Sequence, residues 1–228
     1  MFLNTIPGFE KIFKTDIQPP KVIIVSGVPG SLKSSFTYIM LTKYVQNTGQ
    51  FGLYATLEES TDSYLNNMES LGIEPSVNLQ ISDYTDFRGD DEESIDYLQF
   101  TEKMIKYFKE TRGDQFTCFG FDSLGALYSL MGDSENMRNR MYHFFHMLRQ
   151  NNLISFIIME RSKDGESHLL GNEGFLSDGI IVLGMTRRQG KLIRFIQIEK
   201  MRATQHSMES YALEVGNGGI SILGSIFE

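Results

Sequence analysis

Short apolar runs alternate with longer segments in which apolar residues recur three or four positions apart. The short runs predict strands, and the longer segments predict helices that bury one face. We expect strands at 21–27, 51–60, 78–85, 116–123 and 154–160, and helices at 34–49, 60–73, 95–113 and 133–152. This alternation is typical of the α/β class, with a mostly parallel, twisted sheet that helices flank on both faces.

The C-terminal part of the chain has a different pattern. Residues 179–201 form two alternating runs around Gln189-Gly190, and residues 210–223 repeat this pattern around Asn217-Gly218. Such pairs of runs predict antiparallel hairpins. We interpret them as a C-terminal antiparallel β extension of the same sheet. No Pro-, Ser- or Gly-rich linker divides the chain, so we expect residues 1–228 to form a single domain.

Composition narrows the cellular setting. The 228 residues carry a net charge of −8, which argues against a general affinity for nucleic acid. A single cysteine, Cys118, excludes an internal disulfide framework and is typical of a reducing cytoplasm. We find no apolar run near the ~20 residues that span a bilayer, and no secretory signal. We therefore expect a cytoplasmic protein without membrane insertion.

The segment 27–34, GVPGSLKS, is the candidate for chemistry. It follows a predicted strand, precedes a predicted helix and fits the phosphate-loop pattern G-x-x-x-x-G-K-[ST] except at Leu32, where a glycine is expected. Loop amides and the helix start would form an anion site. Lys33 would reach the β- and γ-phosphates, and the Ser34 hydroxyl would ligate Mg²⁺. The alternative is an ordinary Gly-Pro turn that leads into a helix.

Leu32 decides how far this interpretation extends. A leucine is tolerated there if the residue is already helical and its side chain turns away from the nucleotide. We expect nucleotide binding to survive and hydrolysis to be slow. The expected nucleotide-binding residues are Gly27, Val28, Pro29, Gly30, Ser31, Leu32, Lys33, Ser34 and Ser35.

Acidic residues follow three of the predicted strands. Asp122 ends a buried apolar strand, where an unpaired carboxylate is costly, so we expect it to hold Mg²⁺; a structural cap is the alternative. Glu58 and Glu59 are adjacent carboxylates suited to orienting an attacking water, although Glu59 could instead begin the next helix. Glu160-Arg161 is either a sensor of the γ-phosphate or a salt-bridged strand end.

Several segments, in the same order along the chain, resemble the KaiC-like branch of the RecA superfamily of P-loop ATPases. They are TIPGFEKIF, GVPGSLKS, ATLEES, GFDSL, FLSDGIIVL, IEKMRATQHS and the terminal GNGGISIL. The resemblance implies a RecA-like P-loop NTPase fold, ATP and Mg²⁺ as cofactors, and a catalytic part for Glu58 and Glu59. It also implies a homo-oligomer, expected to be a hexameric ring, with active sites between subunits and an unidentified protein partner.

The same resemblance assigns roles to the segment 200–206. In similar proteins, the lysine and arginine of a K-x-R segment enter the nucleotide site of the neighbouring subunit; here these are Lys200 and Arg202. His206 matches a position that approaches the nucleotide. Without the resemblance, Lys200 and Arg202 would be interpreted as solvated cations at a strand end.

Two other functions stay open at this point. Leu32 favours a nucleotide-binding switch with little turnover. A DNA-binding module related to RecA-type or RadA-type recombinases would use the loop that runs from Arg161-Ser-Lys163 to Ser177. After Lys163 the residues DGESHLLGNEG are acidic or neutral, so nucleic-acid binding is disfavoured.

Overall fold

The computed structural model describes residues 1–84, 95–131, 136–161 and 173–227. Within these ranges the strands form one sheet with the order β3-β2-β4-β5-β1-β6-β7-β8-β9. The bounds are β1 (Lys21–Gly27), β2 (Phe51–Thr56), β3 (Leu79–Asp83), β4 (Phe116–Asp122), β5 (Ile154–Glu160), β6 (Gly179–Arg188), β7 (Lys191–Met201), β8 (Tyr211–Gly216) and β9 (Gly219–Ser225). Strands β1 to β6 pair in parallel, and β6 to β9 pair antiparallel. The predicted α/β fold with an antiparallel extension is confirmed.

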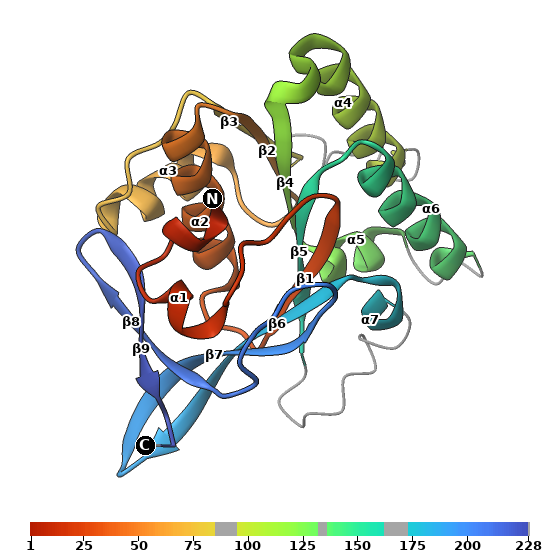
Figure 1. The fold of residues 1–228 in the computed structure, drawn as a ribbon. Coiled ribbons are helices and arrows are strands. Elements are labelled where there is room, and N and C mark those ends of the chain that lie inside the picture. Colours follow the sequence, from red (N-terminus) through yellow and green to blue (C-terminus); the bar gives the residue numbers. More distant parts are fainter. Residues whose placement is uncertain (85–94, 132–135, 162–172, 228) are drawn as a thin grey trace.

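The helices cover both faces of the parallel part (Figure 1). Their bounds are α1 (Phe9–Ile12), α2 (Lys33–Thr48), α3 (Thr61–Ser70), α4 (Tyr97–Arg112), α5 (Leu124–Met131), α6 (Met137–Gln150) and α7 (Glu173–Leu176). Strand β1 shows the reason. Ile23 and Val25 join the core with α1, α2 and α3, whereas Val22 and Ile24 join the core with α4, α5 and α6. A strand that is apolar on both faces therefore lies between two helical layers.

The β6–β7 hairpin forms where the sequence predicted it. Gln189 and Gly190 form the turn, with φ of 50° and 77°. Positive φ at both central residues matches the right-handed twist of the flanking strands. The hairpin reverses the chain, so the end of β7 returns to the edge of the sheet where β6 begins.

The end of β2 and two short helices differ from the predicted elements near the site. Strand β2 ends at Thr56 instead of continuing through residue 60, because the Thr56 hydroxyl accepts hydrogen bonds from the amides of Glu58 (3.2 Å) and Glu59 (3.4 Å) and turns the chain. The short helices α5 and α7 were not predicted. The loop considered for DNA contact lies largely at 162–172, outside the described residues.

Among the described helices, none combines the length and apolar character that crossing a bilayer requires.

Candidate nucleotide site

The carboxyl ends of the parallel strands gather the predicted residues at one edge. Gly27 on β1 pairs with Glu160 on β5, and Thr56 on β2 pairs with Asp122 on β4. The phosphate loop leaves β1 here. In open α/β sheets, ligands bind at this edge.

The phosphate loop, residues 28–32, connects β1 with α2 through two left-handed residues. Gly30 has φ of 80° and Leu32 has φ of 76°. Gly27 allows β1, β6 and the loop to lie close together, since a Cβ at this position would lie 2.1 Å from Leu183 O and 2.6 Å from Ser31 Oγ. The turn directs the start of α2 toward the space beyond the strand ends, as a phosphate cradle requires.

Leu32 corrects one part of the sequence interpretation. We expected a tolerated leucine to be helical already, but it is the left-handed residue before α2, a conformation that costs a residue with a Cβ ~1–2 kcal/mol. Its side chain packs against the core beneath α1 and α2. The missing glycine is therefore felt in the backbone, where Leu32 has a φ that favours glycine.

Lys33 and Ser31 have unused hydrogen-bonding capacity at the loop. Lys33 is 9% exposed, and its Nζ donates to Val28 O at 3.4 Å. An ammonium has three donors, so others stay available to an anion. Ser31 Oγ is buried and has no hydrogen-bond partner among the described residues. Since buried polar groups are usually paired, these two residues fit a bound anion.

Asp122 lies beside the start of α2. It is 3% exposed, and its Oδ2 accepts a hydrogen bond from the Tyr54 hydroxyl at 2.9 Å. Burial raises the pKa of Asp122 to about 6, hydrogen bonds from Ser34 and Tyr54 oppose this shift, and the charges of Glu58 and Glu160 add to it. A buried carboxylate next to a serine hydroxyl and two further carboxylates is suited to a divalent cation.

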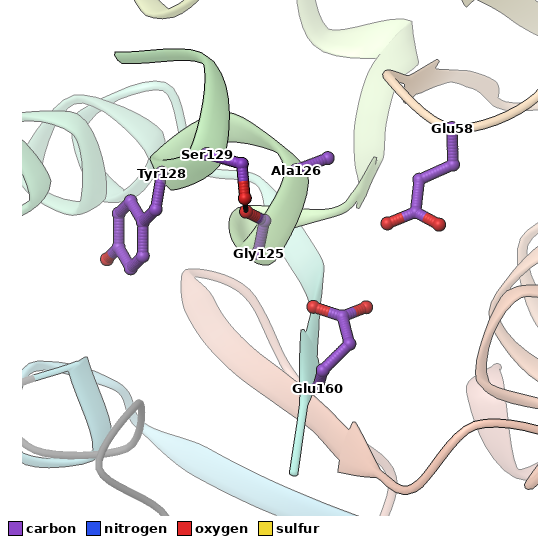
Figure 2. A pocket seen from close by; sticks show the side chains of 6 residues that line it. All are labelled: Glu58, Gly125, Ala126, Tyr128, Ser129 and Glu160. Atoms are coloured by element: carbon purple, nitrogen blue, oxygen red, sulfur yellow. Dashed lines mark hydrogen bonds between the residues drawn. The ribbon is translucent and has the colours of Figure 1, made fainter. Parts of the chain in front are cut away.

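Glu58 and Glu160 converge on the other side of Asp122. The Ser123 hydroxyl lies 2.7 Å from Glu58 Oε1 and 3.3 Å from Glu160 Oε2. Figure 2 shows both carboxylates pointing into the same space next to Gly125 in the first turn of α5. This space is a cavity of about 540 Å³, lined by Glu58, Gly125, Ala126, Tyr128, Ser129 and Glu160.

Glu59 points elsewhere. Its Oε1 accepts hydrogen bonds from Ser63 Oγ and Asn67 Nδ2, both at 2.6 Å and both on α3. The two adjacent glutamates are therefore divided: Glu58 faces the cavity and Glu59 braces the next helix.

Arg161 comes directly after Glu160 and spans from the end of β1 to β7. Its amide donates to Gly27 O at 3.0 Å, and its Nε donates to Ser26 Oγ at 2.9 Å. Its guanidinium forms a two-point ion pair with Glu199, at 3.0 and 2.6 Å. The sequence left two alternatives for this strand end, a salt bridge or a sensor of the γ-phosphate. Arg161 forms a salt bridge, and Glu160 lines the cavity.

Lys200 and Arg202 lie at the amino ends of the parallel strands, whereas the phosphate loop lies at their carboxyl ends. Lys21, the first residue of β1, donates to Arg202 O at 2.7 Å, whereas the loop begins after the last residue of β1. Six strand steps of about 3.3 Å separate these ends by ~20 Å. These cations are therefore too far away to serve the phosphate loop of their own chain.

The two cations also differ in their availability. Lys200 Nζ donates to the carbonyls of Gly174 (2.9 Å) and Ser177 (2.7 Å), and burial lowers its pKa. The Arg202 side chain is 56% exposed and lies 3.5 Å from Asp178. Arg202 is the more accessible of the pair.

His206 contacts the N-terminal segment. It pairs with Phe13 in an isolated bridge, and its Nδ1 lies 3.0 Å from Ser207 O. Its predicted contact with a nucleotide stays a prediction that requires an assembled form.

Several residues of the site were not found from the sequence. Ser123 joins the two carboxylates, and Arg194 on β7 donates from Nε to Gly30 O at 3.2 Å on the phosphate loop. The Tyr54 hydroxyl donates to Asp122, and the Tyr64 hydroxyl lies next to that of Tyr54. Within the described part of the chain, no group of three or more His, Cys, Asp or Glu side chains could hold a metal. A cation here would therefore be shared between Ser34, Asp122 and the phosphates of a nucleotide, as is usual for Mg²⁺.

Comparison with known proteins gives a consistent family. A family model described as "ATPase: KaiC" matches residues 4–225. The circadian clock protein KaiC3 of Synechocystis sp. is 24% identical over 93% of this chain and 43% of its own length. The UPF0273 protein of Thermotoga maritima is 26% identical over 96% of this chain and 94% of its own length. A KaiC-like protein from Pyrococcus horikoshii has a similar structure, with a TM-score of 0.81 and 22% identity over 96% of both chains. The chain thus spans less than half the length of the clock protein KaiC3.

Proposed function

Because the chain belongs to the KaiC family of ATPases, we propose that it binds ATP with Mg²⁺ and hydrolyses it slowly. We further propose that it forms a homo-oligomeric ring, expected to be a hexamer, and acts as a nucleotide-dependent regulator. A protein partner would recognise the conformation of this ring. The observation that carries the proposal is the convergence of Lys33, Asp122 and Glu58 at one edge of the sheet, around the start of α2.

The residues of this edge divide the work. Loop amides and Lys33 would bind the β- and γ-phosphates, and Ser34 and Asp122 would hold Mg²⁺. Bound Mg²⁺ supplies positive charge to the phosphates as negative charge develops on them. Glu58 would orient the attacking water and accept its proton, and the Ser123 hydroxyl would fix the Glu58 carboxylate.

The opposite edge supports active sites between subunits. Arg202 is exposed, and it is separated from its own phosphate loop by the length of β1. Inserted into a neighbour's site, its guanidinium would neutralise charge on the transferred phosphoryl group. Lys200, whose ammonium is bound to two carbonyls at α7, would hold that segment in place unless assembly releases it.

A nucleotide switch with little turnover is the second candidate. The left-handed backbone of Leu32 favours it. Residual strain next to Lys33 could leave the lysine imperfectly placed for the transition state while ground-state binding persists. Measured turnover with Mg²⁺-ATP separates the two candidates.

The test of the proposal is ATP binding by calorimetry. Lys33→Ala removes the ammonium at the cradle and should abolish measurable binding of Mg²⁺-ATP. Lys191→Ala, at the exposed tip of the β6–β7 hairpin, is the matched control and should bind like the wild type. Unchanged affinity of the Lys33 variant would contradict the proposed site.

A further inference from the structure

A pair of buried tyrosines lies behind the metal-binding side of the site. Tyr54 on β2 is 0% exposed, and Tyr64 in the first turn of α3 is 1% exposed. Their hydroxyls are 2.9 Å apart. Tyr54 donates to Asp122 Oδ2 at 2.9 Å, and the Tyr64 hydroxyl lies 2.8 Å from Ser34 O on α2.

Packing alone does not explain these hydroxyls. The rings of Tyr38, Tyr54 and Tyr64 contact one another, with centroid distances of 5.1 to 5.7 Å, inside the core beneath α2 and α3. Phenylalanine would fill the same space without the cost of burying a polar group. Both hydroxyls are instead directed to the two elements that carry the candidate metal ligands.

Counting protons gives the row of hydrogen bonds a direction. Each hydroxyl has one proton to donate. When Asp122 is a carboxylate, Tyr54 must donate to it, so the Tyr54 oxygen can only accept. Tyr64 can then donate to Tyr54 or to the Ser34 carbonyl, but not to both. Tyr54 therefore holds Oδ2 of Asp122, Tyr64 supports Tyr54, and the lone pairs of Asp122 that this hydrogen bond leaves free can face a metal ion or its water.

We propose that Tyr54 and Tyr64 are positioning residues that orient the Asp122 carboxylate for Mg²⁺ and fix β4, α2 and α3 relative to one another around the nucleotide. The inference rests on the proposed function, because it assigns a role toward the Mg²⁺ that accompanies ATP. It deepens that function by placing the determinants of metal affinity on β2 and α3, outside the phosphate loop.

The experiment measures nucleotide affinity by calorimetry at increasing Mg²⁺, and hydrolysis is not needed as a readout. Tyr54→Phe removes one hydroxyl and keeps the ring. The Mg²⁺ concentration that gives half of the gain in ATP affinity should rise about tenfold, as is typical when a residue behind a metal ligand is changed. Affinity measured in EDTA should stay within a factor of about two, because the phosphate loop is unchanged.

Two further variants keep the test decisive. Tyr64→Phe acts one hydrogen bond further from Asp122 and should shift the Mg²⁺ response in the same direction by a smaller factor. Tyr84→Phe is the matched control: this tyrosine is also fully buried, and its hydroxyl lies 3.0 Å from Thr101 Oγ1 on α4. The control should match the wild-type Mg²⁺ response. Melting temperatures of all three variants establish that each is folded.

The outcomes separate this inference from the proposed function. If the wild type binds ATP and Tyr54→Phe has the wild-type Mg²⁺ response, the positioning role is wrong and the proposed function stands. Weakening of the Tyr54 variant by the same factor with Mg²⁺ and in EDTA also overturns it, since that result indicates general loosening. If the wild type does not bind ATP under any condition, both conclusions fail together.

Discussion

Ser123 Oγ lies 2.7 Å from Glu58 Oε1 and so holds the carboxylate of Glu58 toward the cavity beside α5. The adjacent Glu59 is held in the opposite sense by two side chains of α3. Neighbours in the sequence that look equivalent are thus unequal in space, and this difference can be measured.

We expect Glu58→Gln to lower the ATP hydrolysis rate by about 100-fold, the usual lower range for losing a general base. ATP affinity should persist, because Glu58 does not contribute to the phosphate loop. Glu59→Gln is the matched control and should change the rate by less than about threefold, since its carboxylate faces α3. Equal losses in both variants would contradict the division of the pair.

Mixed assemblies test whether Arg202 acts on a neighbouring subunit. Arg202→Ala and Glu58→Gln should each be inactive alone. In a random equimolar mixture, half of the subunits keep Glu58 and half keep Arg202, so about a quarter of the sites combine both, and the mixture should recover about a quarter of wild-type hydrolysis.

Arg187→Ala, at the exposed end of β6, is the matched control for the loss of an arginine. Alone, it should be active, since Arg187 lies on the hairpin away from Arg202. A mixture that stays as inactive as its Arg202 and Glu58 components would show that Arg202 does not complete a neighbour's site.

The raised pKa of Asp122 makes stability depend on pH when Mg²⁺ is removed. The pKa is about 6 in the folded chain, against an ordinary value of 3.8, so the folded state binds this proton more tightly than the unfolded state. The resulting stabilisation is complete below about pH 4 and is lost as the pH rises through about 6. At pH 8 the buried charge should cost on the order of 2–3 kcal/mol.

Asp122→Asn removes that charge and keeps an acceptor for Tyr54. In EDTA at pH 8 the variant should melt at a temperature roughly 5 °C higher than the wild type, and the difference should shrink toward pH 4. The exposed Asp114→Asn is the control, and its melting temperature should match that of the wild type. With saturating Mg²⁺-ATP the order should reverse, because the wild type alone can bind the metal fully. A constant difference across the pH range would contradict this assignment.

Leu32 predicts an unusual ranking of substitutions. At its φ of 76°, glycine should be more favourable than alanine by ~1 kcal/mol, because only alanine has a Cβ that clashes in the left-handed region. Both variants lose the packing of the leucine side chain and differ from each other by one methyl group. The backbone therefore decides, and Leu32→Gly should melt at a higher temperature than Leu32→Ala.

Lys106, exposed in the middle of α4, gives the reference for this ranking. There Lys106→Ala should be more stable than Lys106→Gly, also by ~1 kcal/mol, since alanine is the better helix former. If alanine is preferred at both positions, residue 32 does not adopt the left-handed conformation in solution.

Features that depend on strand direction are predictable from the sequence. Asp122 and Glu58 come together with the phosphate loop because carboxyl ends of parallel strands share one edge, a consequence of the alternating pattern alone. The opposite position of Arg202 is equally predictable, since the hairpin at Gln189-Gly190 returns β7 to the start of β6. The roles of the side chains are a separate matter and stay predictions.

The orientation of side chains is not predictable from the pattern. Tyr54 and Tyr64 occupy apolar positions of β2 and α3, where a hydroxyl gives no signal of its partner. Ser123 directly precedes α5, and this apolar run is too short to be assigned as a helix by periodicity, so the position of the Ser123 hydroxyl was not predictable. The expectation of a helical Leu32 is wrong because φ depends on how the loop joins two elements, and residue type only indicates which values are costly.

Arg161 directly links the end of β1, where the phosphate loop begins, with the strand that leads to Lys200. Its amide is attached to Gly27, the last residue before the phosphate loop, and its guanidinium to Glu199. A loop that tightens around a ligand would pull on β7 through Arg161 and through Arg194, whose Nε donates to Gly30 O. In the proposed ring, β7 leads to the cations that would enter the neighbouring site, so these contacts would couple the occupancy of one site to the next.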